Sequence, residues 1–275
     1  MLRAAMGVDH YENFPVASLL LPRRLREPVA AIYAFARSAD DFADEGAMPP
    51  QERLLRLDGY RRELDAIAAG LSTQHPLFTR LRPVIAAYRL PLGLFHDLLG
   101  AFEQDVRKDR YADYEELLAY CTRSANPIGR LLLHLFDATG EENLRQSDAI
   151  CTSLQLINHW QDVAIDLKKN AAGRLYLPAD EMQRFGVDVA QLHESRCDEN
   201  FRALMRFQVD RARRLMLSGA PLGRRLPGRI GLEIRAIVAG GLRILAKMEA
   251  ADYDIFRRRP VLTPGDWPRL LLDAL

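Results

Sequence analysis

The sequence predicts an all-α protein, a single helical bundle around a central cavity. Apolar residues recur at helical spacing in most segments, whereas no run alternates apolar and polar residues as a half-buried strand does. The 275 residues contain no internal repeat and no low-complexity linker, so we expect one domain over residues 1–275. The connections between helical segments are short and contain Gly and Pro, which favours antiparallel neighbouring helices.

The helical segments are expected in the following order. A polar and aromatic stretch at residues 9–22 precedes the first helix, and Pro28 is suited to the first turn of that helix. The spacing of apolar residues then predicts helices at residues 28–45, 53–69, 76–88, 92–106, 142–168, 178–184, 188–218 and 229–258, with a short capping helix at 267–275.

A break interrupts the apolar run between Tyr120 and Phe136, at residues 124–129. There Asn126 and Pro127 suit an N-cap followed by the first turn of a new helix. A break that exposes backbone polar groups to a cavity is an equal alternative.

The composition is that of a globular protein, and it excludes some classes of function. Hydrophobic residues make up 48% of the chain, charged residues 27%, and the net charge is +1, so no nucleic-acid partner is expected. Cys121, Cys151 and Cys197 lack CxxC spacing and cannot all pair, which indicates a reducing, cytoplasmic location. The N-terminus lacks the apolar core of a signal peptide, and no apolar run approaches the roughly 18 residues of a membrane span.

The most unusual segment is LQLINHWQDVAIDLKKNAAGRLYLP, at residues 154–178. At about 100° per residue, its polar side chains fall within an arc of roughly 80° on a mostly apolar helix; they are Gln155, Asn158, Asp162 and Asp166. Such a helix is expected to be buried, with the polar strip facing a cavity. Buried carboxylates need a partner or a cation, and oxygen ligands one turn apart suit Mg²⁺. A solvated acidic surface is the alternative, and His159 is interpreted as a structural residue off the strip.

A second acidic strip lies on the segment VAAIYAFARSADDFADE, in the first expected helix. Arg37, Asp40, Asp41 and Asp44 fall within about 100° of one another, with Tyr33 one turn earlier. Asp40 and Asp44 are four residues apart and repel each other unless a positive charge lies between them. Taken alone, this strip could equally be a solvated helix end or a strip that faces a cavity. Two such strips on two apolar helices favour a cavity that both helices line.

Two carboxylate strips facing each other across a bundle predict a site for a magnesium-bound diphosphate. The candidate metal ligands are Asp40, Asp44, Asn158, Asp162 and Asp166. Arg37, Lys168 and Arg174 are expected to neutralise the remaining charge. Departure of diphosphate leaves a carbocation, which survives only among aromatic rings and without water. The candidates for that lining are Phe14, Tyr33, Tyr120, Tyr176 and Tyr253.

These two segments resemble the aspartate-rich signatures of the squalene/phytoene synthase family, which joins prenyl chains head to head. The resemblance extends from HYENFP at residues 10–15 to YDIFRRRP at residues 253–260, and RLYLP follows the second signature. It implies an isoprenoid-synthase fold and a Mg²⁺-dependent reaction on a prenyl diphosphate. The candidate substrate-binding residues are Asn13, Tyr33, Arg37, Gln155, Asn158, Lys168, Arg174 and Tyr253.

Three departures from the family pattern favour one of the reactions that the family catalyses. SANPIG replaces a small-residue stretch of the AGTVG type, ENFP replaces a serine-rich start, and QDVAID stands where phytoene synthases tend to have RDVGED. Together these resemble the family's hydroxysqualene synthases of the bacterial hopanoid pathway. That branch ionises presqualene diphosphate, opens its cyclopropane ring and captures water without a nicotinamide cofactor. The catalytic candidates are the four aspartates Asp40, Asp44, Asp162 and Asp166, with Tyr176, and with Asn126 or a nearby backbone group holding the water.

Three alternatives to a hydroxysqualene synthase remain, and each is less favoured by the sequence. The nearest is a synthase that condenses two farnesyl or geranylgeranyl diphosphates into squalene, dehydrosqualene or phytoene. A relative that binds prenyl diphosphate without catalysis, and a purely structural bundle, rank lower because both aspartate pairs are intact. The basic loops, one with Arg224, Arg225 and Arg229 and one at residues 257–259, are interpreted as solvated. Their contact with phospholipid head groups at the inner face of the cell membrane is the alternative.

Overall fold

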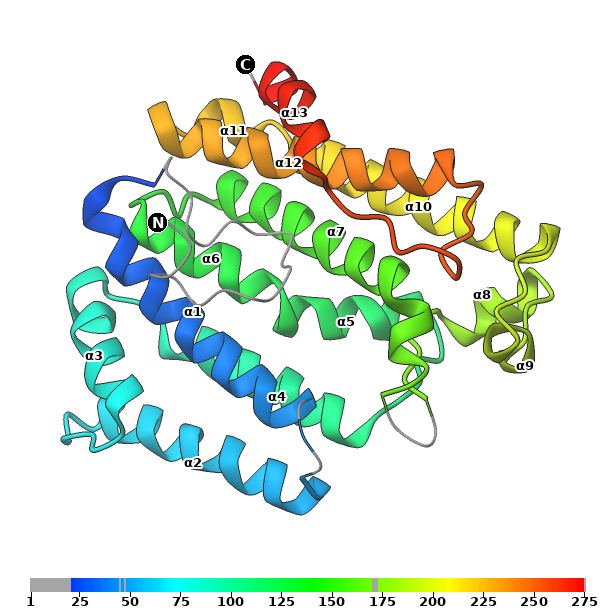
Figure 1. The fold of residues 1–275 in the computed structure, drawn as a ribbon. Coiled ribbons are helices and arrows are strands. Elements are labelled where there is room, and N and C mark those ends of the chain that lie inside the picture. The colour runs from blue at the N-terminus through cyan, green and yellow to red at the C-terminus, as the bar shows by residue number, and fades with distance from the viewer. Residues whose placement is uncertain (1–20, 45, 47, 170–172, 275) are drawn as a thin grey trace.

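The computed structural model describes residues 21–44, 46, 48–169 and 173–274, and these form a bundle of helices (Figure 1). The helices are α1 (Arg23–Asp44), α2 (Pro50–Ala68), α3 (Pro76–Tyr88), α4 (Leu92–Arg107), α5 (Tyr114–Ser124), α6 (Asn126–Leu135), α7 (Glu141–Asp166), α8 (Ala179–Arg184), α9 (Val189–His193), α10 (Glu199–Gly219), α11 (Leu222–Arg225), α12 (Gly228–Ala250) and, after a 3₁₀ turn at Pro264–Asp266, α13 (Trp267–Ala274). The described residues contain no strand, only an isolated bridge between Arg110 and Leu175. The predicted all-α class is confirmed.

The central element is α7, which lies between two groups of helices (Figure 1). One buried apolar cluster joins α7 to α5, α10 and α12, and a second joins α1, α2, α3 and α4 with Leu131 and Leu135 of α6. Phe35 anchors the second cluster through ring contacts with Tyr60, Phe78 and Phe95. The site described below lies where the two clusters meet.

The first helix begins earlier than the sequence predicts. α1 starts at Arg23, so Pro28 lies inside the helix rather than in its first turn. Proline has no backbone donor, and one helical hydrogen bond is therefore missing there. The helix continues because Leu25 is fully buried and extends the apolar face of Val29 and Ile32.

The expected break at residues 124–129 is present, but its capping differs from the expectation. α5 ends at Ser124 and α6 begins at Asn126, so Ala125 occupies the cap position and makes no side-chain cap. Asn126 is instead buried, and its side-chain oxygen accepts a hydrogen bond of 3.0 Å from Thr152 Oγ1 of α7.

Two long helices predicted towards the C-terminus are shorter in the structure. The segment expected at 188–218 divides into α9 and α10, because Ser195 adopts a positive φ of 54° and Asp198 caps α10. α12 stops at Ala250, and Asp252 and Tyr253 both follow with positive φ. Among the described residues, no helix is both long and apolar enough to cross a membrane.

Candidate active site

A cavity of about 450 Å³ lies between α1, α4, α5, α6, α7 and α12. Along both α1 and α7 the lining changes from apolar to charged towards the C-terminal end. On α1 it runs from Val29 and Ile32 to Asp40 and Asp44, and on α7 it runs from Leu154 through Gln155, Asn158, Asp162 and Asp166. At 1.5 Å per residue, the lining stretch of α1 spans roughly 20 Å. The cavity is therefore long, with a polar end and an apolar end.

On α1, the acidic strip faces this cavity. Arg37, Asp40 and Asp44 all line it, while Arg37 also pairs with Asp41 at 2.7 Å. Burial raises the pKa of Asp40 to about 7, and the nearby carboxylates Asp44 and Asp105 add to the effect. One carboxylate of this strip is thus held in surroundings that favour its neutral form.

Asp44 is held by two cations. Arg174 donates to Asp44 Oδ1 at 2.6 Å and Lys169 donates to Oδ2 at 2.5 Å. Burial opposes ionisation, but these two cations outweigh it and hold the pKa of Asp44 below its usual value. Lys169 also lies 3.3 Å from Asp166 of α7, so a single ammonium bridges the two acidic strips.

On α7, the predicted polar strip faces the same cavity. Asp166 is buried, which raises its pKa to about 6 despite the nearby Lys169. Asp162 accepts two hydrogen bonds from Arg259, at 2.5 and 3.0 Å. Arg259 comes from the segment after α12, so the C-terminal part of the chain closes this side of the polar end.

Two basic residues differ from the sequence-based assignment. Lys168, which was predicted to bind the diphosphate, is exposed and does not line the cavity. Lys169 lines the cavity in its place. A turn continues past the end of α7, since Lys169 N donates to the backbone oxygen of Asp166. It returns Lys169, but not Lys168, to the side of Asp166, so this spacing could have identified Lys169. Arg259, interpreted as solvated, lines the cavity; its partner Asp162 is 97 residues away in sequence, and no local pattern indicates the pair.

Other predicted site residues lie near the cavity wall or away from it. Arg174 is buried behind Asp44 and donates to the backbone oxygen of Asp105. Asn126 is buried without lining the cavity. Tyr253 packs into the core, with the guanidinium of Arg206 5.5 Å from its ring centre. Asn13 and Phe14 lie outside the described residues.

A buried group of aromatic and ionisable side chains forms part of the cavity wall. Asp105 accepts hydrogen bonds from Tyr120 at 2.7 Å and from Tyr176 at 3.1 Å. Burial raises the pKa of Asp105 to about 7, although Arg174 and the two tyrosine hydroxyls oppose the shift. Asp105 was not among the predicted site residues; its position on the apolar α4 face of Leu98 and Phe102 is the signal that could have identified it.

His159 is a buried, stacked residue, as its interpretation as a structural residue expects, but it also belongs to this wall. Its ring stacks on Tyr176 with centres 3.6 Å apart, and burial lowers its pKa well below the usual value. At about 100° per residue it falls only roughly 20° beyond Asp166, so the helical wheel could have placed it at the cavity. Its ring is neutral at physiological pH.

The donor set fits Mg²⁺ held together with a phosphate ligand. Among the described residues, no three His, Cys, Asp or Glu side chains are close enough to hold a metal by themselves. The cavity nevertheless offers carboxylate and amide oxygens on two helices: Asp40, Asp44, Asn158, Asp162 and Asp166. Mg²⁺ prefers such ligands and is commonly held by one or two carboxylates with phosphate oxygens and water. The residues thus fit a metal that binds with its substrate.

The squalene/phytoene synthase family model matches residues 8–266. The hydroxysqualene synthase of Rhodopseudomonas palustris is 35% identical over 88% of this chain and 80% of its own length. The phytoene synthase of Mycobacterium bovis is 31% identical over 90% of this chain and 80% of its own length.

The structural comparison agrees with the sequence comparison. The crystal structure of squalene synthase HpnC from Alicyclobacillus acidocaldarius superposes with a TM-score of 0.81 and 39% identity, over 89% of this chain and 90% of that chain. This similarity confirms the expected isoprenoid-synthase fold. The chain belongs to the squalene/phytoene synthase family.

Proposed function

We propose that the protein is a hydroxysqualene synthase of hopanoid biosynthesis, which converts presqualene diphosphate to hydroxysqualene and diphosphate with Mg²⁺. The observation that carries this proposal is the division of one cavity into a polar end and an apolar end. Five aspartates and three cations line the polar end. A prenyl diphosphate likewise has its charge at one end and its hydrocarbon chain at the other. The R. palustris relative, 35% identical, carries the name of this activity.

The polar end is suited to the diphosphate group. Arg37, Lys169 and Arg259 line it and can donate charge-assisted hydrogen bonds to phosphate oxygens. These cations pair with carboxylates of the two acidic strips, and phosphate oxygens would compete for them while the carboxylates would hold Mg²⁺. Bound Mg²⁺ supplies the positive charge that makes diphosphate a good leaving group.

The apolar walls are suited to the cation that remains after ionisation. Phe102, Tyr120 and Tyr176 place aromatic rings in the wall, and aromatic faces attract positive charge. The ring of His159 is neutral there, so it adds no repulsive charge. Ile230, Ile234 and Ile237 of α12 supply apolar surface that excludes water from the rest of the substrate.

The capture of water needs a polar group beside this apolar wall. Ser124 lines the cavity, and its hydroxyl is buried with no hydrogen-bond partner among the described residues. The Asn126 side chain is engaged by Thr152 and lies behind the wall. We therefore assign to Ser124 the water-holding role that the sequence suggested for Asn126 or a nearby group. The water adds its oxygen to the cation and gives up one proton.

The second candidate function is condensation of two prenyl diphosphates into squalene, dehydrosqualene or phytoene. Similarity to a phytoene synthase at 31% identity favours it, and the same aspartates and cations would serve both reactions. In either case we propose a cytoplasmic enzyme that passes its insoluble product to the inner face of the cell membrane.

The test supplies presqualene, farnesyl and geranylgeranyl diphosphates in separate incubations with Mg²⁺ and identifies the products. Hydroxysqualene from presqualene diphosphate alone supports the proposal. A C30 or C40 hydrocarbon from either of the other two substrates would assign the protein to the condensing branch.

A further inference from the structure

A second cavity, of about 490 Å³, lies on the outer face of α12, between the C-terminal end of α10 and helix α13. Its apolar surface comes from α10 and α12: Leu217, Ala220, Val238, Ala239, Leu242 and Ala246. Leu217 is 52% exposed, although it is a large apolar residue. On α13, next to this groove, Leu272 is 74% exposed and Trp267 is 53% exposed. The groove and its margin thus present apolar surface to the outside.

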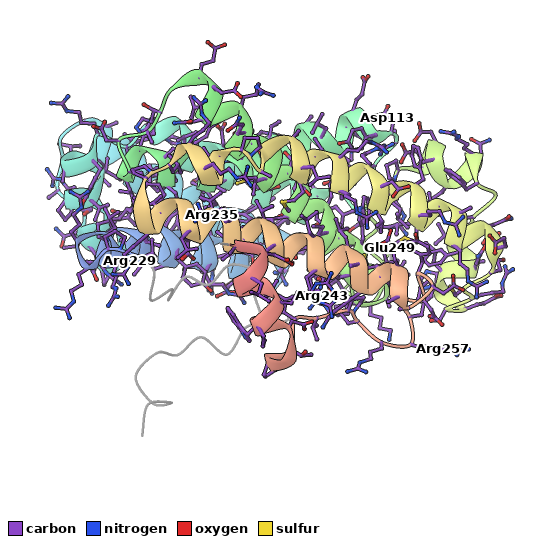
Figure 2. All side chains as sticks on the ribbon, turned by 90° about the horizontal axis from the view of Figure 1, so that it is seen from above. Asp113, Arg229, Arg235, Arg243, Glu249 and Arg257 are labelled. Carbon is purple, nitrogen blue, oxygen red and sulfur yellow. The ribbon has the colours of Figure 1, made fainter. Side chains whose placement is uncertain are left out.

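Positive charge surrounds this apolar surface. Arg224, Arg235, Arg243 and Arg269 line the groove, against a single acidic lining residue, Asp273. Figure 2 labels Arg235 and Arg243 along α12 and shows α13 crossing that helix.

Local acidic groups neutralise only part of this charge. Arg243 pairs with Asp266, and Arg269 lies 3.8 Å from Asp273. Arg235 donates to two backbone oxygens, those of Ala274 and Gly223. The groove therefore keeps an excess of positive charge beside its apolar floor.

Helix α12 separates this groove from the active-site cavity. Ile230, Ile234 and Ile237 line the cavity, whereas Ala239, Arg243 and Ala246 line the groove. At about 100° per residue these two sets lie on opposite faces of the helix. The outer groove is therefore a separate surface, which the active site does not use.

We propose that this groove docks the protein on a membrane containing anionic phospholipids. Arginines around an apolar floor complement a lipid surface, which presents phosphates above acyl chains. The arginines bind head-group phosphates, while Leu217, Leu272 and Trp267 enter the interfacial layer. The basic loop around Arg224, which was expected to be solvated, belongs to this surface. The inference does not depend on the reaction catalysed, because docking is measured without substrate.

The test uses the full chain with phosphatidylglycerol vesicles and with phosphatidylcholine vesicles, at low and at high salt. The chain has two tryptophans, and Trp160 is fully buried, so a change in tryptophan emission reports on Trp267. We expect cosedimentation and a blue shift with phosphatidylglycerol at low salt, and loss of both at high salt or with phosphatidylcholine. Brominated phosphatidylglycerol is expected to quench the shifted emission, and Trp267→Phe to abolish it.

Two double variants, each lacking two exposed arginines, test whether the groove is the surface that binds the membrane. Arg224→Ala with Arg269→Ala is expected to weaken binding to phosphatidylglycerol roughly tenfold or more, because each arginine near an anionic surface contributes a several-fold factor. The control, Arg62→Ala with Arg80→Ala, removes two exposed arginines from α2 and α3, far from α13 (Figure 1), and is expected to bind like the wild type. Circular dichroism checks that both proteins remain folded.

Three outcomes would overturn the proposal. They are no binding to phosphatidylglycerol vesicles at low salt, equal loss of binding in the groove and control variants, and a wild-type dimer that the groove variant converts to a monomer without any vesicle binding. The last result would assign the groove to a second copy of the chain. Product analysis in detergent is expected to be the same for the groove variant and the wild type, so failure of docking is distinguishable from failure of the proposed reaction.

Discussion

At the scale of single residues, the polar end of the cavity is a set of carboxylates that already have cationic partners. Lys169 lies between Asp44 and Asp166, and Arg259 holds Asp162 through two hydrogen bonds. Buried charges without partners cost several kcal/mol, so these pairs offset part of the cost of placing carboxylates in the cavity wall. The same cations are suited to receive the diphosphate group.

Lys169→Ala is predicted to weaken binding of inorganic diphosphate with Mg²⁺ by about tenfold or more, because one charge-assisted hydrogen bond is worth ~1.5–3 kcal/mol. Titration calorimetry measures the affinity. Lys168→Ala is the matched control, since that neighbouring lysine is exposed and does not line the cavity. Equal effects of the two substitutions would contradict the assignment of Lys169.

Ser124→Ala is predicted to reduce the share of alcohol among the products by about tenfold, the factor for one lost hydrogen bond of ~1.4 kcal/mol. Elimination products should rise in its place, because the cation then loses a proton instead of gaining water. Asn126→Ala is expected to lower stability through the lost contact with Thr152 while leaving the product ratio unchanged. Gas chromatography of the extracted products gives the ratio, and a reversed pattern would return the role to Asn126.

Asp105 gives the folded protein a pH-dependent stability. Burial raises its pKa to about 7, well above the value near 3.9 of an unfolded chain. Between about pH 4 and 7 the folded state therefore binds more protons than the unfolded state, and stability falls as pH rises. Asp105→Asn removes this titration, so its melting temperature relative to the wild type should increase between pH 5 and pH 8. A difference that stays constant with pH would contradict this account.

The spacing of residues in the sequence predicted much of the site, because both acidic strips lie on regular helices. Arg259 could not be predicted, since its contact with Asp162 depends on the path of the chain after α12. Tyr253 was placed wrongly for a related reason: it follows α12 with a positive φ of 60°, which turns it into the core. Residues outside regular helices lack the periodicity that locates a side chain.

At the scale of secondary-structure elements, the position of α7 decides the geometry of its polar strip. α10 approaches α7 closely at Gly219, where an added Cβ would lie 2.5 Å from the backbone oxygen of Gln146 and 2.6 Å from Ile150 Cγ1. Backbone atoms cannot move aside without shifting the helix. Glycine at this position therefore allows α10 to cover α7.

Gly219→Ala is predicted to destabilise the protein by roughly 1–3 kcal/mol, the usual cost of overpacking. Gly93→Ala in α4 is the control, because a Cβ there meets no atom within 4 Å, and alanine favours the helix. Urea denaturation followed by circular dichroism measures both. A stabilised Gly219→Ala variant would contradict the close approach of α10 to α7.

Helix periodicity predicted most helices but not all their ends. The apolar pattern continues through residues 188–218, so it did not indicate the turn at Ser195, which requires a backbone conformation rare outside glycine. Asp198, which caps α10 by accepting from Phe201 N, is the local signal that could have divided the segment. For α1, the buried Leu25 outweighed the usual placement of proline near a helix start.

At the scale of the whole molecule, α12 divides two surfaces with different roles. Its inner face closes the cavity that we propose for presqualene diphosphate, and its outer face belongs to the groove that we propose for lipid. Contact with a membrane would suit the insoluble product that we propose for this enzyme. Helical periodicity in the sequence predicted the all-α class. It could not predict that α12 lines a cavity on one face and a groove on the other, because that depends on which helices pack against α12.

The most direct test of the central claim supplies presqualene diphosphate and Mg²⁺ to the wild type and to Asp162→Asn in isotopically labelled water. The wild type is expected to form hydroxysqualene with one labelled oxygen. The variant, checked to be folded by circular dichroism, is expected to be slower by about a hundredfold or more, because it lacks one group that stabilises developing charge. Labelled alcohol formed equally fast by the variant, or no product from presqualene diphosphate with the wild type, would contradict the claim.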